Sequence, residues 1–252
     1  MHRHHIYPSR MRMPRGGGGT NSFKTLALSD LTVDKGQYST LNASQSGTDI
    51  DIEFGGGNST LDPRNFGFLE YDTGVATLPL AVPGYRWVFN LYLAFDVSGF
   101  SGNEDLNLGL YIFSDTADST GSSGTGYFGG GLISENGGTN KTLKMYTPNR
   151  KASSSLPLSS TVVAATANRM TLQCIERVIN EGNVRVRQDL GLTQFGSTGG
   201  WDANFKQRTN ASAVTSGSNW RAGVWMSRAT NGLSNVSFSI TDFSFAALKW
   251  PQ

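Results

Sequence analysis

The sequence predicts an all-β protein, and three observations support that class. Glycine makes up 31 of the 252 residues, well above an average usage of about 7%. Only 16% of the residues are charged, a composition that favours strands and turns over helices. From residue 23 onward, short apolar runs alternate with clusters of Gly, Asn, Ser and Asp, and no helical stripe persists for three turns. We therefore expect an antiparallel β-sandwich, and the length allows one large domain with a sizeable core.

The first 22 residues are expected to form an extended N-terminal arm. They show no hydrophobic period and end near a glycine run, residues 16–19, which is typical of a hinge. We therefore divide the chain into an anchoring arm, residues 1–22, and a single sandwich domain, residues 23–252.

The arm is basic although the whole chain is nearly neutral. Residues 1–15 contain four arginines and no acidic residue, which leaves 17 basic against 19 acidic residues in the rest of the chain. Four arginines neutralise few phosphates and the body adds no net positive field, so nucleic acid is not an expected partner. We expect the arm to contact other proteins of an assembly through these residues: Arg3, Tyr7, Arg10, Arg12 and Arg15.

Several kinds of site are excluded by the residue types of the body. All three histidines lie within the first five residues, so the body holds no imidazole for base catalysis or metal binding. Cys174 is the single cysteine, which excludes an intrachain disulfide and a cysteine-rich zinc site. Asp115 and Asp118 are weak calcium candidates, and we expect neither metal nor cofactor. With no secretory signal and no run of about 18 apolar residues, we expect synthesis in the cytoplasm and no membrane partner.

The clearest strand is expected at residues 87–97. Every second residue there is large and apolar, while Asn90, Tyr92 and Asp96 occupy alternate positions. The inward set should therefore be Trp87, Phe89, Leu91, Leu93, Phe95 and Val97.

Three further strands should follow along the chain. Residues 107–113 are apolar at both parities, which is typical of a strand in the middle of a sandwich. The Ser/Gly-rich segment 114–126 should be an exposed loop. Residues 131–134 and 141–146 are separated by Glu135-Asn136-Gly137-Gly138, a turn signal that predicts antiparallel pairing between them.

The remaining strands are expected in two pairs. Residues 169–187 predict a hairpin whose inward side carries Met170, Leu172 and Cys174. The closing strands should span residues 221–227 and 235–245. In the last of these the apolar positions change from even to odd numbers at Thr241-Asp242, which predicts a β-bulge there.

The order of these elements resembles the concanavalin A-like and laminin-G-like jelly-roll sandwiches. The resemblance covers residues 66–248 and is carried by the 87–113 strand pair, the 169–187 hairpin and the closing strands at 220–227 and 236–245. It implies an antiparallel jelly-roll β-sandwich. Lectins, carbohydrate-binding modules, glycoside hydrolases and adhesive modules all belong to this superfamily, so the resemblance bears on fold more than on function.

One acidic segment resembles the catalytic strand of laminarinase-type glycosidases on this fold. Those enzymes place carboxylates at alternate positions of one strand, as Asp49, Asp51 and Glu53 do here. The resemblance would make them nucleophile, helper and acid/base, a mechanism that needs carboxyl groups about 5–5.5 Å apart. The alternative is an edge strand whose apolar residues face the core and whose acids face water. We favour the alternative and expect no enzymatic activity.

A sugar-binding site would combine aromatic rings with polar side chains. Pyranose rings stack on aromatic faces, while their hydroxyl groups need hydrogen-bond partners. The alternative is that the rings lie in the core or an interface and the arginines form a solvated face. The candidate ligand residues are Tyr92, Tyr111, Arg177, Arg185, Arg187, Trp201 and Trp225.

These features favour a structural protein of a virus particle. A sandwich with a basic arm suits a phage head-decoration, head-fibre or tail-associated protein that is made in the host cytoplasm. The arm would anchor the chain to other virion proteins, and a homo-oligomer is expected. The sandwich would face outward, where a host polysaccharide is the candidate ligand. Two alternatives stay open, a glycan-binding lectin module and a laminarinase-like hydrolase.

Overall fold

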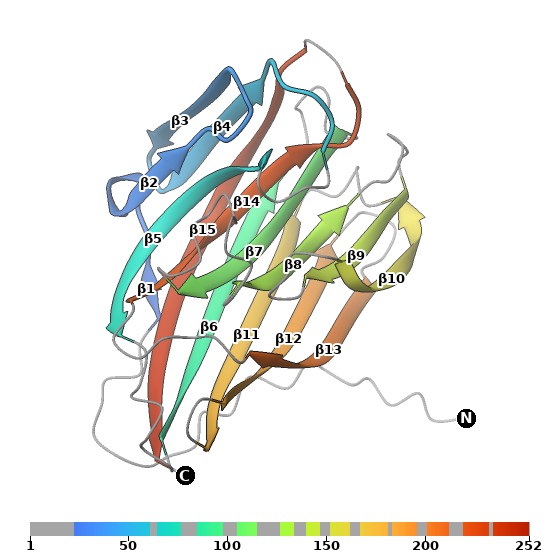
Figure 1. The fold of residues 1–252 in the computed structure, drawn as a ribbon. Coiled ribbons are helices and arrows are strands. Elements are labelled where there is room, and N and C mark those ends of the chain that lie inside the picture. The colour runs from blue at the N-terminus through green and yellow to red at the C-terminus, as the bar shows by residue number, and fades with distance from the viewer. Residues whose placement is uncertain are drawn as a thin grey trace.

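Alternating apolar residues build two antiparallel sheets that face each other across one core (Figure 1). The computed structural model describes these parts of the chain: residues 23–60, 65–76, 85–97, 105–114, 127–133, 140–146, 152–161, 167–180, 183–195, 201–211, 219–231 and 234–251. The short 3-10 turn η1 (Leu28–Asp30) lies between β1 and β2, and Asn65 and Asp105 also have 3-10 conformation. No helix in the described ranges has the length and apolar character that crossing a membrane requires.

Sheet A has eight strands, and β1 (Lys24–Thr25) pairs along one side of β15. Its other strands follow in the order β13 (Trp201–Ala211), β12 (Asn183–Phe195), β11 (Ala167–Asn180), β6 (Tyr85–Asp96), β15 (Val236–Pro251), β4 (Asp49–Gly55) and β3 (Thr40–Ser46). Sheet B has seven strands in the order β10 (Ala152–Thr161), β9 (Asn140–Tyr146), β8 (Tyr127–Ile133), β7 (Leu106–Ser114), β14 (Asn219–Arg228), β5 (Gly67–Ala76) and β2 (Leu31–Asp34). The expected jelly-roll sandwich is confirmed.

Strand β6 confirms the alternation expected at residues 87–97. Phe89, Leu91 and Leu93 are at most 1% exposed and belong to the main core. Trp87 is only partly buried and stacks on Phe89 with ring centroids 6.1 Å apart. The strand lies inside sheet A, between β11 and β15.

Strand β15 contains the expected β-bulge. It pairs with β6 as Ile240 opposite Phe95 and then as Asp242 opposite Ala94, so Thr241 is the additional residue. The bulge keeps both halves of the strand facing the core, with these side chains buried: Val236, Phe238, Ile240, Phe243 and Phe245.

The β11–β12 hairpin is confirmed and is longer than expected. Its pairing runs from Ala167 opposite Phe195 to Asn180 opposite Asn183. Met170, Leu172 and Cys174 on β11 are all buried in the main core, as expected from the alternation. Because this hairpin continues sheet A beyond β6, it extends the flat polar side of the sheet described below.

The antiparallel pairing of β8 with β9 is also confirmed. Several strands lie where none was expected, and β10 and β13 are two of them. Strand β10 crosses a serine-rich segment that contains Pro157, and it forms an edge of sheet B. Proline is tolerated at a sheet edge because no neighbour there needs its missing N–H. Strand β13 forms an edge of sheet A and pairs with β12 along its length.

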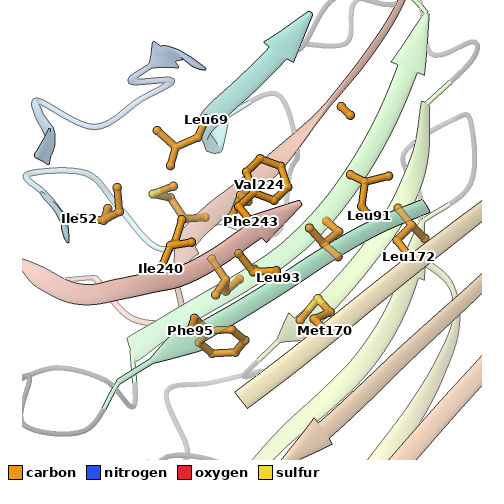
Figure 2. Packing of buried hydrophobic residues seen from close by; sticks show 14 of the residues in the cluster. Ile52, Leu69, Leu91, Leu93, Phe95, Met170, Leu172, Val224, Ile240 and Phe243 are labelled. Carbon is orange, nitrogen blue, oxygen red and sulfur yellow. The ribbon is translucent and has the colours of Figure 1, made fainter. Parts of the chain in front are cut away.

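The core lies between the two sheets and draws on both. Figure 2 shows Leu91, Leu93 and Phe95 of β6 gathered with residues of β11, β15 and β4 from the same sheet. Leu69 of β5 and Val224 of β14 approach from sheet B, and both are fully buried. The two layers therefore depend on one shared apolar cluster.

Truncating a core side chain of sheet A should destabilise the fold far more than truncating its outward neighbour. Phe89→Ala, Leu93→Ala and Phe238→Ala should each lower the free energy of unfolding by about 2–5 kcal/mol, because each leaves a cavity. Tyr92→Ala should cost much less, since Tyr92 is only half-buried. Urea unfolding followed by tryptophan fluorescence measures the difference. An equal loss for Tyr92→Ala and Phe89→Ala would contradict the register of β6.

Candidate functional site

The outer face of sheet A, turned away from sheet B, carries polar side chains around one aromatic ring. Tyr92 of β6 lies opposite Thr171 of β11 on one side and Ser244 of β15 on the other. Because Leu91 and Leu93 point into the core, the Tyr92 ring belongs to the opposite face. It is half-buried, so part of the phenol remains accessible.

Hydrogen bonds order the polar groups beside Tyr92. Gln173 donates from Nε2 to Oδ1 of Asn90 at 2.7 Å, which joins β11 to β6 two positions along the strands. On the other side Ser244 donates from Oγ to Oδ1 of Asp242 at 2.7 Å. The Tyr92 ring therefore lies between two polar pairs that hydrogen bonds hold in place. Asn90 and Ser244 are buried, at 2% and 5% exposed, so the polar groups that a ligand can reach beside Tyr92 are the half-buried Gln173 and Asp242.

Opposite charges flank the Tyr92 hydroxyl. Burial raises the pKa of Tyr92 above its ordinary value, Arg169 lowers it and Asp242 raises it, with burial the largest effect. The phenol therefore keeps its proton at neutral pH and can donate a hydrogen bond. Arg169 is exposed, and its register partner on β6 is Ala94, which lies two positions from Tyr92 and on the same face.

The three acids of β4 also lie on the outer face of sheet A, as expected. Ile50, between two of them, is buried. Asp51 accepts a hydrogen bond from the Ser239 hydroxyl, and Glu53 accepts one at 2.8 Å from Nδ2 of Asn235. Both partners come from β15 or the turn before it, so the acids bridge strands and serve as acceptors.

The edge position proposed for this strand is wrong. Strand β4 pairs with β15 on one side and with β3 on the other, so β3 forms the edge of sheet A. The polar run at residues 40–46 was not assigned to a strand from the sequence. These residues form β3, which pairs with the side of β4 that faces away from β15. Without β3, the backbone N–H and C=O groups on that side of β4 would have no strand partner.

Gly55 leaves space for the Asn235 side chain, which contacts Glu53. A Cβ atom at Gly55 would lie 2.1 Å from Oδ1 of Asn235, closer than atoms can pack. The glycine at the end of β4 therefore lets the Asn235 amide settle against the strand.

Tyr111 and Trp225 are not surface platforms for a ligand, and this expectation is corrected. Both side chains are fully buried on the outer side of sheet B, in a second apolar cluster with Phe66, Phe68 and Ile133. Phe66 stacks on Trp225 with ring centroids 4.6 Å apart, and Phe68 meets Tyr111 edge-on at 5.2 Å. Tyr111 and Trp225 do alternate along their strands with residues of the main core. They are nevertheless buried, because both faces of this part of sheet B are covered.

Glycines on neighbouring strands make room for the Trp225 ring. Trp225 of β14 lies opposite Gly109 of β7, which lies opposite Gly131 of β8. A Cβ atom at Gly109 would lie 2.3 Å from the indole and one at Gly131 would lie 2.6 Å from it. The ring therefore lies across two strands that have no side chain at those positions. The glycine run at 129–131 was the sequence signal for this arrangement.

The remaining candidate ligand residues lie on β11, β12 and β13, where the backbone register places them. Arg177 pairs with Arg185, and Arg187 pairs with both Ile175 and Arg208. Trp201 is the first residue of β13 and pairs with Gln194. The sheet thus brings the three arginines together but leaves Trp201 at the opposite end of the β12–β13 ladder.

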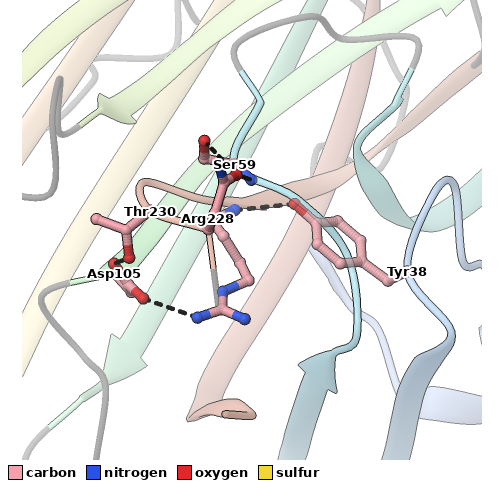
Figure 3. Close-up of polar contacts among 6 residues, drawn as sticks. Tyr38, Ser59, Asp105, Arg228 and Thr230 are labelled. Atoms are coloured by element: carbon pink, nitrogen blue, oxygen red, sulfur yellow. Dashed lines mark hydrogen bonds and ion pairs between the residues drawn. The ribbon is translucent and has the colours of Figure 1, made fainter. Parts of the chain in front are cut away.

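A buried polar cluster that the sequence did not reveal joins three connections of the sandwich (Figure 3). Arg228 at the end of β14 donates from Nη2 to Oδ2 of Asp105 at 2.9 Å, and its side chain is only 3% exposed. The Thr230 hydroxyl donates to the same carboxylate, and the backbone N–H of Arg228 donates to the Tyr38 hydroxyl at 2.9 Å. Ser59 contacts Asn231 in the same region.

The Tyr38 hydroxyl is buried and accepts a hydrogen bond from the backbone of Arg228. Burial raises the pKa of Tyr38 above its ordinary value, although the Arg228 backbone N–H and the Gln37 side chain oppose the shift. The ring packs edge-on against Phe54 with centroids 5.1 Å apart. Tyr38 therefore ties the polar cluster to the core and serves the fold.

Other expected site residues lie outside the described parts of the chain. They are the calcium candidates Asp115 and Asp118 and the assembly residues Arg3, Tyr7, Arg10, Arg12 and Arg15. In the parts that the structure describes, no three side chains of the His, Cys, Asp or Glu type gather as a metal site requires.

Comparison with solved structures identifies the fold. Lectin I from Ulex europaeus, solved with the methyl glycoside of α-L-fucose, superposes with a TM-score of 0.52 at 9% identity, covering 89% of this chain and 95% of the lectin. The fold is the concanavalin A-like jelly roll. The likeness concerns the fold alone, because 9% identity carries no residue from one site to the other.

Two further structures show a similar degree of likeness to this jelly roll. Endo-1,3-β-glucanase from Streptomyces sioyaensis gives a TM-score of 0.49 at 12% identity, covering 89% of this chain and 91% of that chain. Peanut lectin gives 0.49 at 11%, covering 88% and 93%. No family model matches this jelly-roll chain, and no curated protein sequence matches it.

The Arg228–Asp105 pair should be essential for stability. Asp105→Ala should lower the free energy of unfolding by about 3–5 kcal/mol, because it leaves the Arg228 charge buried without its carboxylate. The matched control is Lys24→Ala, which breaks an ion pair with Asp30 at the surface and should cost less than about 1 kcal/mol. Chemical denaturation of both variants compares them, and similar losses would show that the cluster in Figure 3 adds little.

Proposed function

We propose that this protein is a non-enzymatic carbohydrate-binding module whose contact surface is the outer face of sheet A around Tyr92. The half-buried ring beside the Gln173–Asn90 hydrogen bond carries the proposal. A sugar ring can stack on the phenol while its hydroxyl groups exchange hydrogen bonds with the half-buried Gln173 amide and Asp242 carboxylate.

The shared fold supports this proposal without deciding it. Lectin I from Ulex europaeus was solved with a methyl fucoside, so the same sandwich can present a sugar site. Folds host many functions, and the residues around Tyr92 therefore carry the argument.

Binding is preferred to hydrolysis because of the surroundings of the β4 acids. A retaining glycosidase needs one carboxyl group that carries a proton and a second that attacks the sugar. One oxygen of Asp51 accepts a hydrogen bond from Ser239 of β15, and one oxygen of Glu53 accepts one from Asn235 just before β15, so both acids link β4 to the segment beside it. These contacts support a structural role for the acids.

The same proposal places the module on the surface of a virus particle. Residues 1–22, with four arginines and no acid among the first 15, would attach the chain to other proteins of a virus particle, in which a homo-oligomer displays the sandwich outward. The charge separation between residues 1–15 and the rest of the chain supports this setting, since a basic segment is attracted to an acidic surface of an assembly partner.

Removing the Tyr92 ring should weaken glycan binding while leaving the fold intact. Across a panel of immobilised β-glucan, agar, carrageenan and alginate, Tyr92→Ala should reduce affinity roughly tenfold for whichever glycans the protein binds. The matched variant Tyr92→Phe keeps the ring and should retain most of the affinity. Unchanged affinity in Tyr92→Ala would move the site elsewhere. Release of reducing sugar that disappears in Glu53→Gln would replace binding by hydrolysis.

Deleting residues 1–19 should separate folding from assembly. The strands that the structure describes begin at Lys24, so the melting temperature should be nearly unchanged. Incorporation into the particle, or oligomer formation measured by light scattering, should be lost. A large fall in melting temperature would show that the deleted residues belong to the sandwich.

A further inference from the structure

The strand register gathers arginines at one end of sheet A. Arg177 of β11 pairs with Arg185 of β12, and Arg187 of β12 pairs with Arg208 of β13. Arg185 and Arg187 are two residues apart and so share a parity on β12. Four arginine positions thus occupy two adjacent cross-strand pairs over three neighbouring strands.

A fifth arginine position adjoins this group. Ile175 of β11 pairs with Val88 of β6, and Arg86 lies two residues before Val88 on the same strand. Because neighbouring strands are about 4.8 Å apart, the group spans four strands within roughly 15 Å. We call these five residues the arginine group: Arg86, Arg177, Arg185, Arg187 and Arg208.

Like charges placed directly opposite one another destabilise a sheet. The arginine group contains two such opposed pairs next to each other, an arrangement that adds nothing to the stability of the sandwich. The following pair along the same ladder is Asp189 opposite Lys206, the favourable combination of opposite charges. In the β11–β12 and β12–β13 ladders, opposed arginine positions therefore occur only at this end of the sheet, a placement that suits an anionic ligand.

The acids nearest in register do not balance the group. Glu176 pairs with Val186, so it has the parity opposite to that of Arg177 and Arg185. Asp189 already lies opposite Lys206. Within the described strands β11, β12 and β13, basic positions accordingly outnumber acidic ones at this end.

The arginine group continues the surface that holds Tyr92. On β11 the positions Thr171, Gln173, Ile175 and Arg177 share one parity, and Thr171 lies opposite Tyr92. The buried residues Met170 and Leu172 occupy the other parity. One extended ligand following the strands would therefore meet Tyr92 first and the arginine group about 20 Å further along.

We propose that the ligand of this face is an anionic polysaccharide that bears sulfate or uronate groups, held by the arginine group and by Tyr92. The inference rests on the proposed function and adds the charge class of the glycan. Guanidinium groups bind carboxylate and sulfate oxygens in pairs, with a fixed geometry that neutral sugars do not use.

A polysaccharide fits better than nucleic acid. Nucleic-acid binding relies on a positive field over a long phosphate backbone, whereas the chain after residue 15 has 17 basic and 19 acidic residues. The arginine positions are gathered at one end of neighbouring strands, about 20 Å along the sheet from Tyr92 and the hydroxyl and amide groups beside it. That combination matches a sugar chain with spaced anionic substituents.

Binding of the full-length protein to heparin, alginate, dextran and single-stranded DNA, measured by calorimetry at low and high salt, tests the inference. Heparin or alginate should bind more tightly than dextran. Arg185→Gln/Arg187→Gln should weaken that binding about tenfold or more, and the single variant Arg208→Gln should act in the same direction. The matched control Lys24→Gln/Lys35→Gln removes two positive charges elsewhere and should change affinity little.

The outcomes separate this inference from the proposed function. Equal loss in the arginine and lysine double variants would show a general charge effect and overturn the inference. If Tyr92→Ala weakens dextran or alginate binding while the arginine variants have no effect, the module binds glycans and the anionic class is wrong. Failure of both heparin and alginate to bind would overturn the anionic class, whereas the proposed function fails only if β-glucan, agar and carrageenan also do not bind. Tighter arginine-dependent binding of DNA would replace the glycan with nucleic acid.

Discussion

The pairing of β6 with β15 around the Thr241 bulge is the constraint on which the rest of sheet A depends. Without the additional residue, one half of β15 would turn its aromatic side chains to solvent, because a shift of one position exchanges the two faces of a strand. The bulge lets Phe238 and Phe243 both reach the core. It also places Ser239 against Asp51 before the bulge and Ser244 beside Tyr92 after it.

The two sheets use their outer faces differently, and side-chain size explains the difference. On sheet B the bulky ring of Trp225 lies over Gly109 and Gly131, so aromatic residues form a second buried cluster outside the main core. On sheet A the positions around Tyr92 are polar: Gln173 of β11 donates a hydrogen bond to Asn90 of β6, and Ser244 donates one to Asp242 within β15. A ligand that needs hydroxyl and amide contacts therefore has its natural surface on sheet A.

The residues that determine the fold are different from those that form the proposed ligand surface. The jelly roll follows from alternating apolar residues, and 9% identity to a lectin shows that unrelated side chains can satisfy the same alternation. The outer positions are not constrained by the core. Their chemistry, with Tyr92, Arg169 and the arginine group along one side of β11, is what distinguishes this surface and motivates the anionic-glycan proposal.

The sequence by itself determined the all-β class, the long strand at residues 87–97, the β11–β12 hairpin and the bulge at Thr241. Each of these depends on how apolar and polar residues alternate within a short segment. The sequence did not determine which strand lies at an edge. It placed β4 at the edge, whereas β3 pairs with β4 and forms the edge itself. It also could not distinguish Tyr92 from Tyr111. Both alternate with core residues, but exposure depends on what packs on the outer face of each sheet, and only the tertiary structure decides that.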